Sequence, residues 1–237
     1  MTGNIGPSFD PARIDAIRAS LNKSSPARPS APLGGSPAKP TSSGRPLWVQ
    51  AATIIVAFTV LLYAIEVVDV LVNHRLDRAG VEPRQVDGLW GILFAPVLHF
   101  GWAHLIANTI PMLVLGFLSL MAGIARGIAA TAVVWIVGGV GTWLTGGAGS
   151  VHIGASVLIF GWLTFLLARG LFNRSASQIL IGLVVLVFYG GMLWGVLPSD
   201  PRISWQGHLF GAIGGLVAAW LLSSDQRAAR RTRASAA

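Results

Sequence analysis

The chain has 237 residues, of which 53% are hydrophobic and only 11% are charged. This composition excludes an ordinary soluble globular protein and indicates a membrane protein. The chain contains no cysteine, which excludes disulfide bonds and thiolate chemistry. On a membrane protein, the net charge of +8 indicates basic cytoplasmic segments and not nucleic-acid binding.

The N-terminal tail, residues 1–46, is polar. Its stretch from Ser24 to Pro46 is rich in Pro, Ser, Gly and Ala, a composition that predicts disorder. The stretch from Asp10 to Leu21 predicts either a short amphipathic helix at the membrane surface or a frayed segment. At the other end of the chain, residues 224–237 form a basic tail.

Six apolar segments lie between the tails and form one domain, residues 47–223. Each has at least the roughly 17 residues that a membrane-spanning helix needs. All six should be α-helices, because isolated strands would leave backbone groups unpaired in lipid. The predicted fold class is therefore an all-α membrane protein with a six-transmembrane-helix bundle. The segments lie at about 47–72, 103–122, 127–144, 156–172, 177–197 and 207–223.

The positions of Lys and Arg predict the orientation of the bundle. With the N-terminal tail placed in the cytoplasm, thirteen of the 17 Lys and Arg residues lie in the tails and in the inner turns. Only Arg75, Arg78, Arg84 and Arg202 lie on the outer side. This bias predicts that both termini are cytoplasmic. The excess of Arg over Lys, with many Ala, Gly and Val, indicates a GC-rich bacterial genome and hence a bacterial plasma membrane.

The outer connection from Asn73 to Phe100 begins with charged residues and then becomes apolar from Leu89 to Leu98. This apolar run is too short to span, so it predicts a re-entrant or interfacial segment beside the bundle. The first outer loop should therefore be partly embedded in the membrane, with Trp90 at the interface. In the preceding span, Glu66 and Asp69 lie one turn apart and should face the bundle or reach toward the interface.

Glycines four residues apart recur in the last two spans, as Gly191 with Gly195 and as Gly211 with Gly215. Small residues at this spacing let helix backbones approach closely. Tight packing is therefore the expected role for most of these glycines.

A serine and a histidine begin two different spans from the same side. Ser156 follows a glycine-rich loop at the head of the fourth span, and His208 opens the sixth. If Gly211 and Gly215 pack the sixth helix on the fourth, His208 can take the serine proton as a general base. No carboxylate lies in either span, so the pair would be a dyad. Taken alone, each residue also fits a structural role, the serine as a helix N-cap and the histidine as a hydrogen-bonded core residue.

The second span carries two further polar residues, His104 and Asn108, which lie four apart and so share one helical face. Both side chains can donate hydrogen bonds. Pointed at the serine, they would stabilise a tetrahedral oxyanion, each donor being worth about 3–4 kcal/mol of barrier. The structural alternative is that they hold neighbouring helices together.

Together these blocks resemble the rhomboid family of intramembrane serine proteases. His99-x4-His104-x3-Asn108 is similar to the family's second-span motif. Gly154-Ala155-Ser156 is similar to the start of its Gly-x-Ser-Gly motif, and His208-x2-Gly211-x3-Gly215 is similar to its sixth-span motif. The resemblance covers the six spans and not the tails.

The resemblance implies hydrolysis of peptide bonds within or beside a transmembrane segment of another membrane protein, with one span or several. Ser156 would be the nucleophile and His208 the general base. The fifth span would be a mobile gate through which a substrate helix enters from the lipid bilayer.

The resemblance also implies supporting roles for other residues. His104, Asn108 and the backbone amide of Ser156 would form the oxyanion hole next to Gly154. His99 would help to order the first outer loop or its water supply. Phe160 occupies the position from which family members often stack an aromatic ring on the catalytic histidine.

The sequence departs from the family pattern at two positions. Val157 stands where a glycine usually follows the serine, and a β-branched residue there would crowd the oxyanion hole or narrow the choice of substrate residue at the cut. Gly91 follows Trp90 where many members have arginine, so the contacts of that arginine are missing.

Other functional classes fit less well. No His-Glu-x-x-His motif of a metalloprotease occurs, and an intramembrane aspartyl protease needs two membrane aspartates where only Asp69 lies in a span. No cofactor, metal or nucleic acid is therefore expected. The serious rival is a non-catalytic rhomboid-like pseudoenzyme that binds client transmembrane helices. The presence of the serine, the histidine and the oxyanion donors together favours the enzyme.

Overall fold

The computed structural model describes residues 11–23, 44–200 and 203–234. By contacts the chain divides into two units, residues 1–44 and residues 45–237. In the first unit, α1 (Pro11–Lys23) forms where the sequence predicts either a short helix or a frayed segment. The predicted disorder from Ser24 to Pro46 falls mostly on residues 24–43, which lie outside the described residues.

The second unit contains six helices that are long and apolar enough to cross a membrane, as predicted. The fifth span consists of an α-helix that continues as a 3-10 helix, η4 (Gly190–Val196). The described chain contains a single isolated β-bridge and is otherwise helical or irregular. The six helices are α2 (Leu47–Leu71), α4 (Trp102–Leu120), α5 (Ile124–Thr145), α6 (Ser156–Asn173), α7 (Ala176–Tyr189) and α8 (Trp205–Ala234).

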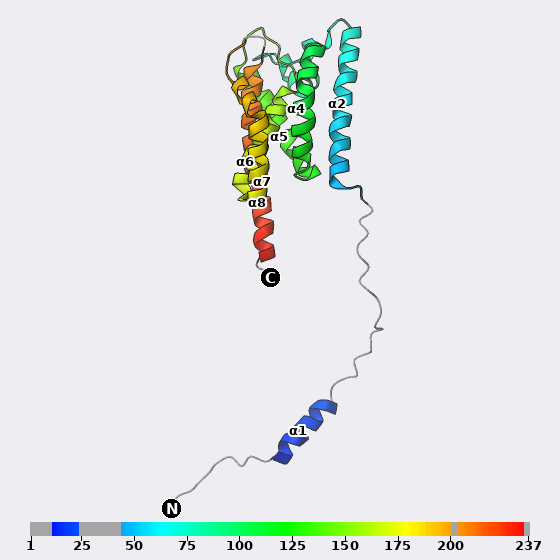
Figure 1. The fold of residues 1–237 in the computed structure, drawn as a ribbon, viewed down its shortest axis with the longest axis vertical. Coiled ribbons are helices and arrows are strands. Elements are labelled where there is room, and N and C mark those ends of the chain that lie inside the picture. The colour runs from blue at the N-terminus through cyan, green and yellow to red at the C-terminus, as the bar shows by residue number, and fades with distance from the viewer. Residues whose placement is uncertain (1–10, 24–43, 201–202, 235–237) are drawn as a thin grey trace, which may run out of the picture. The chain divides into compact units, whose positions relative to one another are not determined.

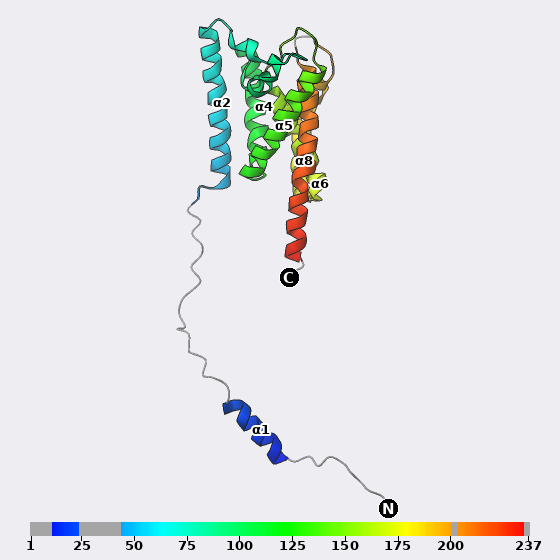
Figure 2. The ribbon, with the colours of Figure 1, turned by 180° about the vertical axis from the view of Figure 1, so that it is seen from behind.

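Helix α6 is the centre of the bundle. Of the apolar stretch of α6, 67% is buried inside the bundle, whereas only 11% of the apolar stretch of the fifth span is buried. In both views α2 stands at one edge of the bundle beside α4, while α6 and α8 lie together at the other side (Figures 1 and 2). Helix α7 lies with them in Figure 1. The fifth span is therefore the most weakly enclosed of the six, and the head of α6 lies among the neighbouring helices.

Glycines set the close packing of α8 on α6. A side chain at Gly211 would overlap the backbone carbonyl of Val157, and one at Gly215 would overlap the carbonyl oxygen of Gly161. The predicted packing of the sixth span on the fourth is thus confirmed. For the fifth span the packing prediction is wrong at Gly191, where an added Cβ would have no described neighbour within 4 Å.

The connection between α2 and α4 folds into short helices, including α3 (Gly91–Phe94), that pack against the bundle. The indole nitrogen of Trp135 on α5 donates to the carbonyl oxygen of Ile92 at 2.7 Å. Trp90 is 71% exposed, as a residue at the interface would be. A side chain at Gly91 would overlap the backbone of Gly80, so the arginine common at this position in the family would not fit this loop.

The last helix is longer than predicted. The sixth span was expected to end at residue 223, but α8 continues without a break to Ala234. The basic composition that marks the tail is compatible with helix, because Arg and Ala are among the best helix formers. Hydropathy marks the end of the apolar segment and not the end of the helix.

Candidate active site

The heads of α6 and α8 lie at the same end of the bundle, which we call the loop end. Ser156 is the first residue of α6, and His208 lies in the first turn of α8. The Oγ atom of Ser156 is 2.9 Å from Nε2 of His208. The fold therefore brings together two residues that are 52 positions apart in the sequence.

The imidazole of His208 is held on its other side. Its Nδ1 atom lies 2.9 Å from the carbonyl oxygen of Gly195 in η4. Because a carbonyl oxygen only accepts, Nδ1 must carry the proton, and Nε2 is the unprotonated nitrogen that faces Ser156. The ring of Phe160 stacks on the imidazole, with centroids 4.1 Å apart and planes at 11°. The histidine is thus fixed in both position and tautomer.

The spacing of Gly195 predicts a packing role, but its neighbours are Phe160 and His208. A Cβ at this position would lie 2.9 Å from Cζ of Phe160 and 3.2 Å from Nδ1 of His208. A side chain here would crowd both rings, so the glycine favours the close approach of the backbone carbonyl to the imidazole. Every residue has a backbone carbonyl, so the sequence could not reveal that the carbonyl of Gly195 holds the imidazole of His208.

Hydrogen-bond donors gather on the other side of Ser156. The residue two positions earlier, Gly154, has a φ of +127°, a conformation that favours glycine. A Cβ there would lie 2.6 Å from Cε1 of His104 and 3.6 Å from Oγ of Ser156. The backbone amides of Ser156 and Val157 lie in the first turn of α6, where they have no intrahelical acceptor.

Asn108 is buried on the same face of α4 as His104. Its Nδ2 atom donates to the carbonyl oxygen of His104 at 3.1 Å. An amide nitrogen carries two N–H groups, so one donor is used within the helix and the other can point elsewhere. Both residues line one cavity of about 1040 Å³ together with Ser156 and His208.

His99 lies just before α4 and is almost fully buried. Its Nε2 atom accepts a hydrogen bond from the backbone amide of Ala155 at 3.3 Å. Its ring packs edge-on against that of His104, with centroids 5.1 Å apart. Burial, with a smaller effect of His104, lowers the pKa of His99 to about 3, so this histidine is neutral and can keep accepting. It contacts the segment that leads into Ser156.

A fourth histidine, His152, links the two loops that lead into the heads of α6 and α8, and sequence reasoning did not single it out. Its Nδ1 atom is 2.7 Å from Oγ of Ser204, and its Nε2 atom is 2.9 Å from Oγ of Ser150. Ser204 in turn accepts a hydrogen bond from the amide of Gly207, next to His208. Burial lowers the pKa of His152. In the sequence, His152 is only a polar residue in a glycine-rich loop, and this pattern does not indicate a role for it.

We expect His152→Phe to lower the rate at which Ser156 reacts with a fluorophosphonate probe by several-fold. Phenylalanine keeps the ring and removes two hydrogen bonds, each worth about 1 kcal/mol, so the heads of α6 and α8 lose a link. The labelling rate of the solubilised protein measures this, and Ser150→Ala, which removes only one of the two bonds, should cause a smaller loss. Wild-type labelling in His152→Phe would contradict this role.

The side chain of Val157 is accommodated by a glycine on α5. A Cβ at Gly138 would overlap Cγ2 of Val157, so the branched side chain fills space that Gly138 leaves free. The two residues also line a small cavity of about 30 Å³ that adjoins Ser156. The bulk that the sequence led us to expect at the oxyanion hole is thus partly taken up by α5.

Comparisons with known proteins match the amino-acid sequence of the chain to one family. The Rhomboid domain family matches residues 86–225. An uncharacterized protein of Mycobacterium tuberculosis is 53% identical over 213 residues, which cover 86% of this chain and 89% of the relative. An uncharacterized protein of Mycobacterium leprae is 54% identical over 191 residues, 77% of this chain and 76% of the relative.

A more distant relative has a descriptive name. The Bacillus subtilis protein named "Putative rhomboid protease YdcA" is 32% identical over 138 residues, which cover 57% of this chain and 68% of the relative. No solved structure is significantly similar to the chain.

Proposed function

We propose that this chain, which belongs to the rhomboid family of membrane proteins, is a serine endopeptidase that cleaves transmembrane segments of other membrane proteins. The observation that carries the proposal is the pair of contacts made by His208. One ring nitrogen faces Oγ of Ser156 at 2.9 Å, and the other is held at 2.9 Å by the carbonyl of Gly195. This is the arrangement of a nucleophile, a base and a group that orients the base.

In this mechanism, Nε2 of His208 takes the proton of Ser156 as Oγ attacks the carbonyl carbon of the scissile peptide bond. The negative charge that forms on the carbonyl oxygen would be stabilised by the amide of Ser156 and by His104 and Asn108. His208 then gives the proton to the leaving amine, and water hydrolyses the acyl-enzyme with the same base. Throughout, the Gly195 carbonyl would keep the imidazole in one tautomer.

The features around the dyad support a membrane-embedded substrate. The weak burial of the fifth span suits a gate through which a substrate helix enters from the bilayer. The small cavity beside Val157 suits a small side chain next to the cut. The excess of Lys and Arg on one side supports a bacterial plasma-membrane protein with both termini in the cytoplasm.

The proposal is tested by covalent labelling of the detergent-solubilised protein with a fluorophosphonate probe. We expect the wild type to be labelled and both Ser156→Ala and His208→Ala to lose the label, because the probe reacts only with an activated serine. Ser199→Ala, which removes an exposed serine near the same end, is the matched control and should label normally. A folded wild type that takes no label would instead support a client-binding pseudoenzyme.

A further inference from the structure

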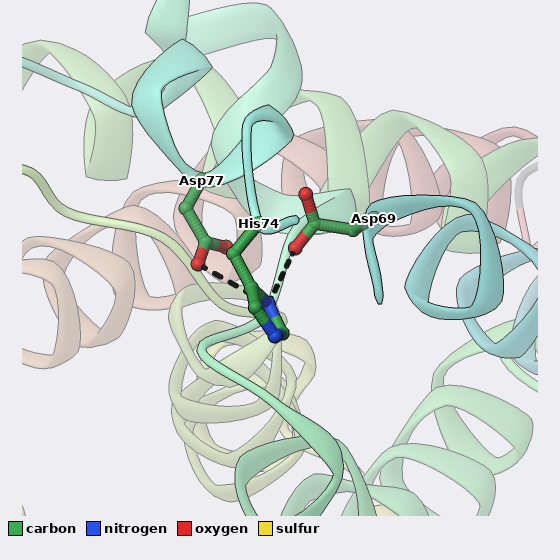
Figure 3. Close-up of side chains that lie close together, drawn as sticks. All are labelled: Asp69, His74 and Asp77. Carbon is green, nitrogen blue, oxygen red and sulfur yellow. Dashed lines mark hydrogen bonds and ion pairs between the residues drawn. The ribbon is translucent and has the colours of Figure 1, made fainter. Parts of the chain in front are cut away.

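A second group of ionisable side chains converges at the loop end, where α2 gives way to the first loop. Asp69, His74 and Asp77 point toward one another (Figure 3). Nδ1 of His74 lies 3.1 Å from Oδ2 of Asp69 and 3.9 Å from Oδ2 of Asp77. One donor atom from each residue lies within 4.8 Å of the others. Three ligand-type atoms are therefore already close together.

The chain path builds this group from a short stretch of sequence. Asn73 and His74 have φ values of 57° and 56°, so the chain reverses just after α2. Oδ1 of Asp69 accepts a hydrogen bond from the amide of Leu76 at 2.7 Å, which fixes that carboxylate. The 3-10 helix η1 (Leu76–Ala79) then returns Asp77 to face it.

Two carboxylate oxygens here are buried without a partner. Glu66 is only 2% exposed, and its Oε1 atom has no hydrogen-bond partner within the described structure; the same holds for Oδ1 of Asp77. Glu66 lies one turn before Asp69 and is close enough for the charges of Asp69, Asp77 and His74 to act on it. Unpaired buried carboxylate oxygens are costly, and a cation beside them would relieve that cost.

The surrounding described residues do not supply that cation. Within the described part of the chain, these carboxylates form ion pairs with His74 alone.

We propose that Asp69, His74 and Asp77 bind a divalent transition-metal ion, Zn²⁺ in the first place. An imidazole nitrogen with carboxylate oxygens is a donor set for Zn²⁺, whereas Mg²⁺ and Ca²⁺ prefer oxygen alone. Ligands about 2.0–2.2 Å from a tetrahedral Zn²⁺ lie about 3.4 Å from one another, so small side-chain rotations complete the site. His74 is 51% exposed on its side chain, which gives the ion a route from solvent.

This site departs from the expectation that the sequence offers no metal. From the sequence, Glu66 and Asp69 should face the bundle or reach toward the interface, and both are only 2% exposed, as residues that face the bundle would be. Asp69 also contacts the start of the first loop through His74 and the amide of Leu76. The ion would tie the end of α2 to η1 and would take no part in the Ser156–His208 chemistry. Chelation should therefore lower stability while leaving the dyad in place.

The proposal is tested by titrating Zn²⁺ into the full-length, tag-free protein in detergent after chelator treatment and dialysis, with the heat of binding as the readout. We expect His74→Gln and Asp77→Asn each to weaken this binding event about tenfold or more, since loss of even outer-shell partners costs 10- to 100-fold. Glutamine at position 74 can still donate to Asp69, so the loss would report ligation. Asp87→Asn, an exposed carboxylate on the same loop, is the matched charge control and should bind as the wild type does.

A second readout separates binding from misfolding. Zn²⁺ should raise the Tm of the wild type and of Asp87→Asn but not that of His74→Gln or Asp77→Asn, because a ligand that binds only the folded state stabilises it. Any Zn²⁺ bound by the histidines near Ser156 would change the Tm of the wild type and of all three variants equally. Such binding therefore does not affect the comparison between them. Equal heats and equal Tm shifts in the wild type and in both ligand variants would overturn the proposal.

Discussion

Replacing His208 with alanine is expected to lower the cleavage rate of a single-span reporter protein by at least about a thousandfold. Oγ of Ser156 makes its 2.9 Å contact with Nε2 of His208, so removal of the imidazole removes the group that takes the serine proton. The rate is measured as product formed in proteoliposomes under single-turnover conditions. Ser156→Ala should be equally inactive, and Ser199→Ala should cleave as the wild type does.

The same reaction should slow as the pH falls. Protonation of His208 removes its acceptor lone pair, so below its working pKa the single-turnover rate should drop about tenfold per pH unit. His99 does not contribute to this fall in rate between pH 5 and 8, because its pKa of about 3 keeps it neutral over that range. A rate that stays constant into acid, with chemistry still limiting, would exclude His208 as the base.

The second large effect is expected at the contact between α8 and α6. In Gly215→Ala the new Cβ would overlap the carbonyl oxygen of Gly161 and Oγ1 of Thr164. Overpacking costs about 1–3 kcal/mol. Displacing the Thr164 hydroxyl adds about 1 kcal/mol, because it strains the 2.7 Å hydrogen bond to the carbonyl of Ala212. Alanine regains about 1 kcal/mol of helix propensity, so the clash should dominate, with a net loss of about 2 kcal/mol.

For a domain of this size that loss corresponds to a fall in Tm of about 4–8 °C. Activity should fall further, because a shift of about 1 Å between the two heads can cost a hundredfold in rate. Gly191→Ala is the matched control, since an added Cβ there has no described neighbour within 4 Å. Equal melting temperatures for Gly215→Ala and Gly191→Ala would show that the α6–α8 contact tolerates the extra methyl group.

Hydropathy and small-residue spacing were enough to predict the six spans and the packing of the last helix on the fourth. The spans and this packing contact could be predicted because both depend on local composition, which can be read directly from the sequence. The helix ends were less accurate, because the lipid boundary ends an apolar run without ending a helix. This is the case at α8, which runs to Ala234, and the reverse holds for the fifth span, where α7 ends at Tyr189.

Side chains of the candidate site could be anticipated because serine, histidine and asparagine are unusual in apolar helices. The group that orients His208 could not, because it is a backbone carbonyl at Gly195 and any residue has one. The cluster at Asp69, His74 and Asp77 also escaped, since it depends on a chain reversal at Asn73 and His74. Two successive non-glycine residues with positive φ are uncommon, and the composition of the loop does not predict them.

The carbonyl of Gly195 belongs to the segment that would have to move if the fifth span admits a substrate. An outward displacement of η4 would break the 2.9 Å contact with Nδ1 of His208 and leave the imidazole free to rotate or change tautomer. A protein with an open gate would then hold a serine without an oriented base. Entry and chemistry would be mutually exclusive states, so premature hydrolysis of a passing loop would be suppressed without any inhibitor or pro-segment.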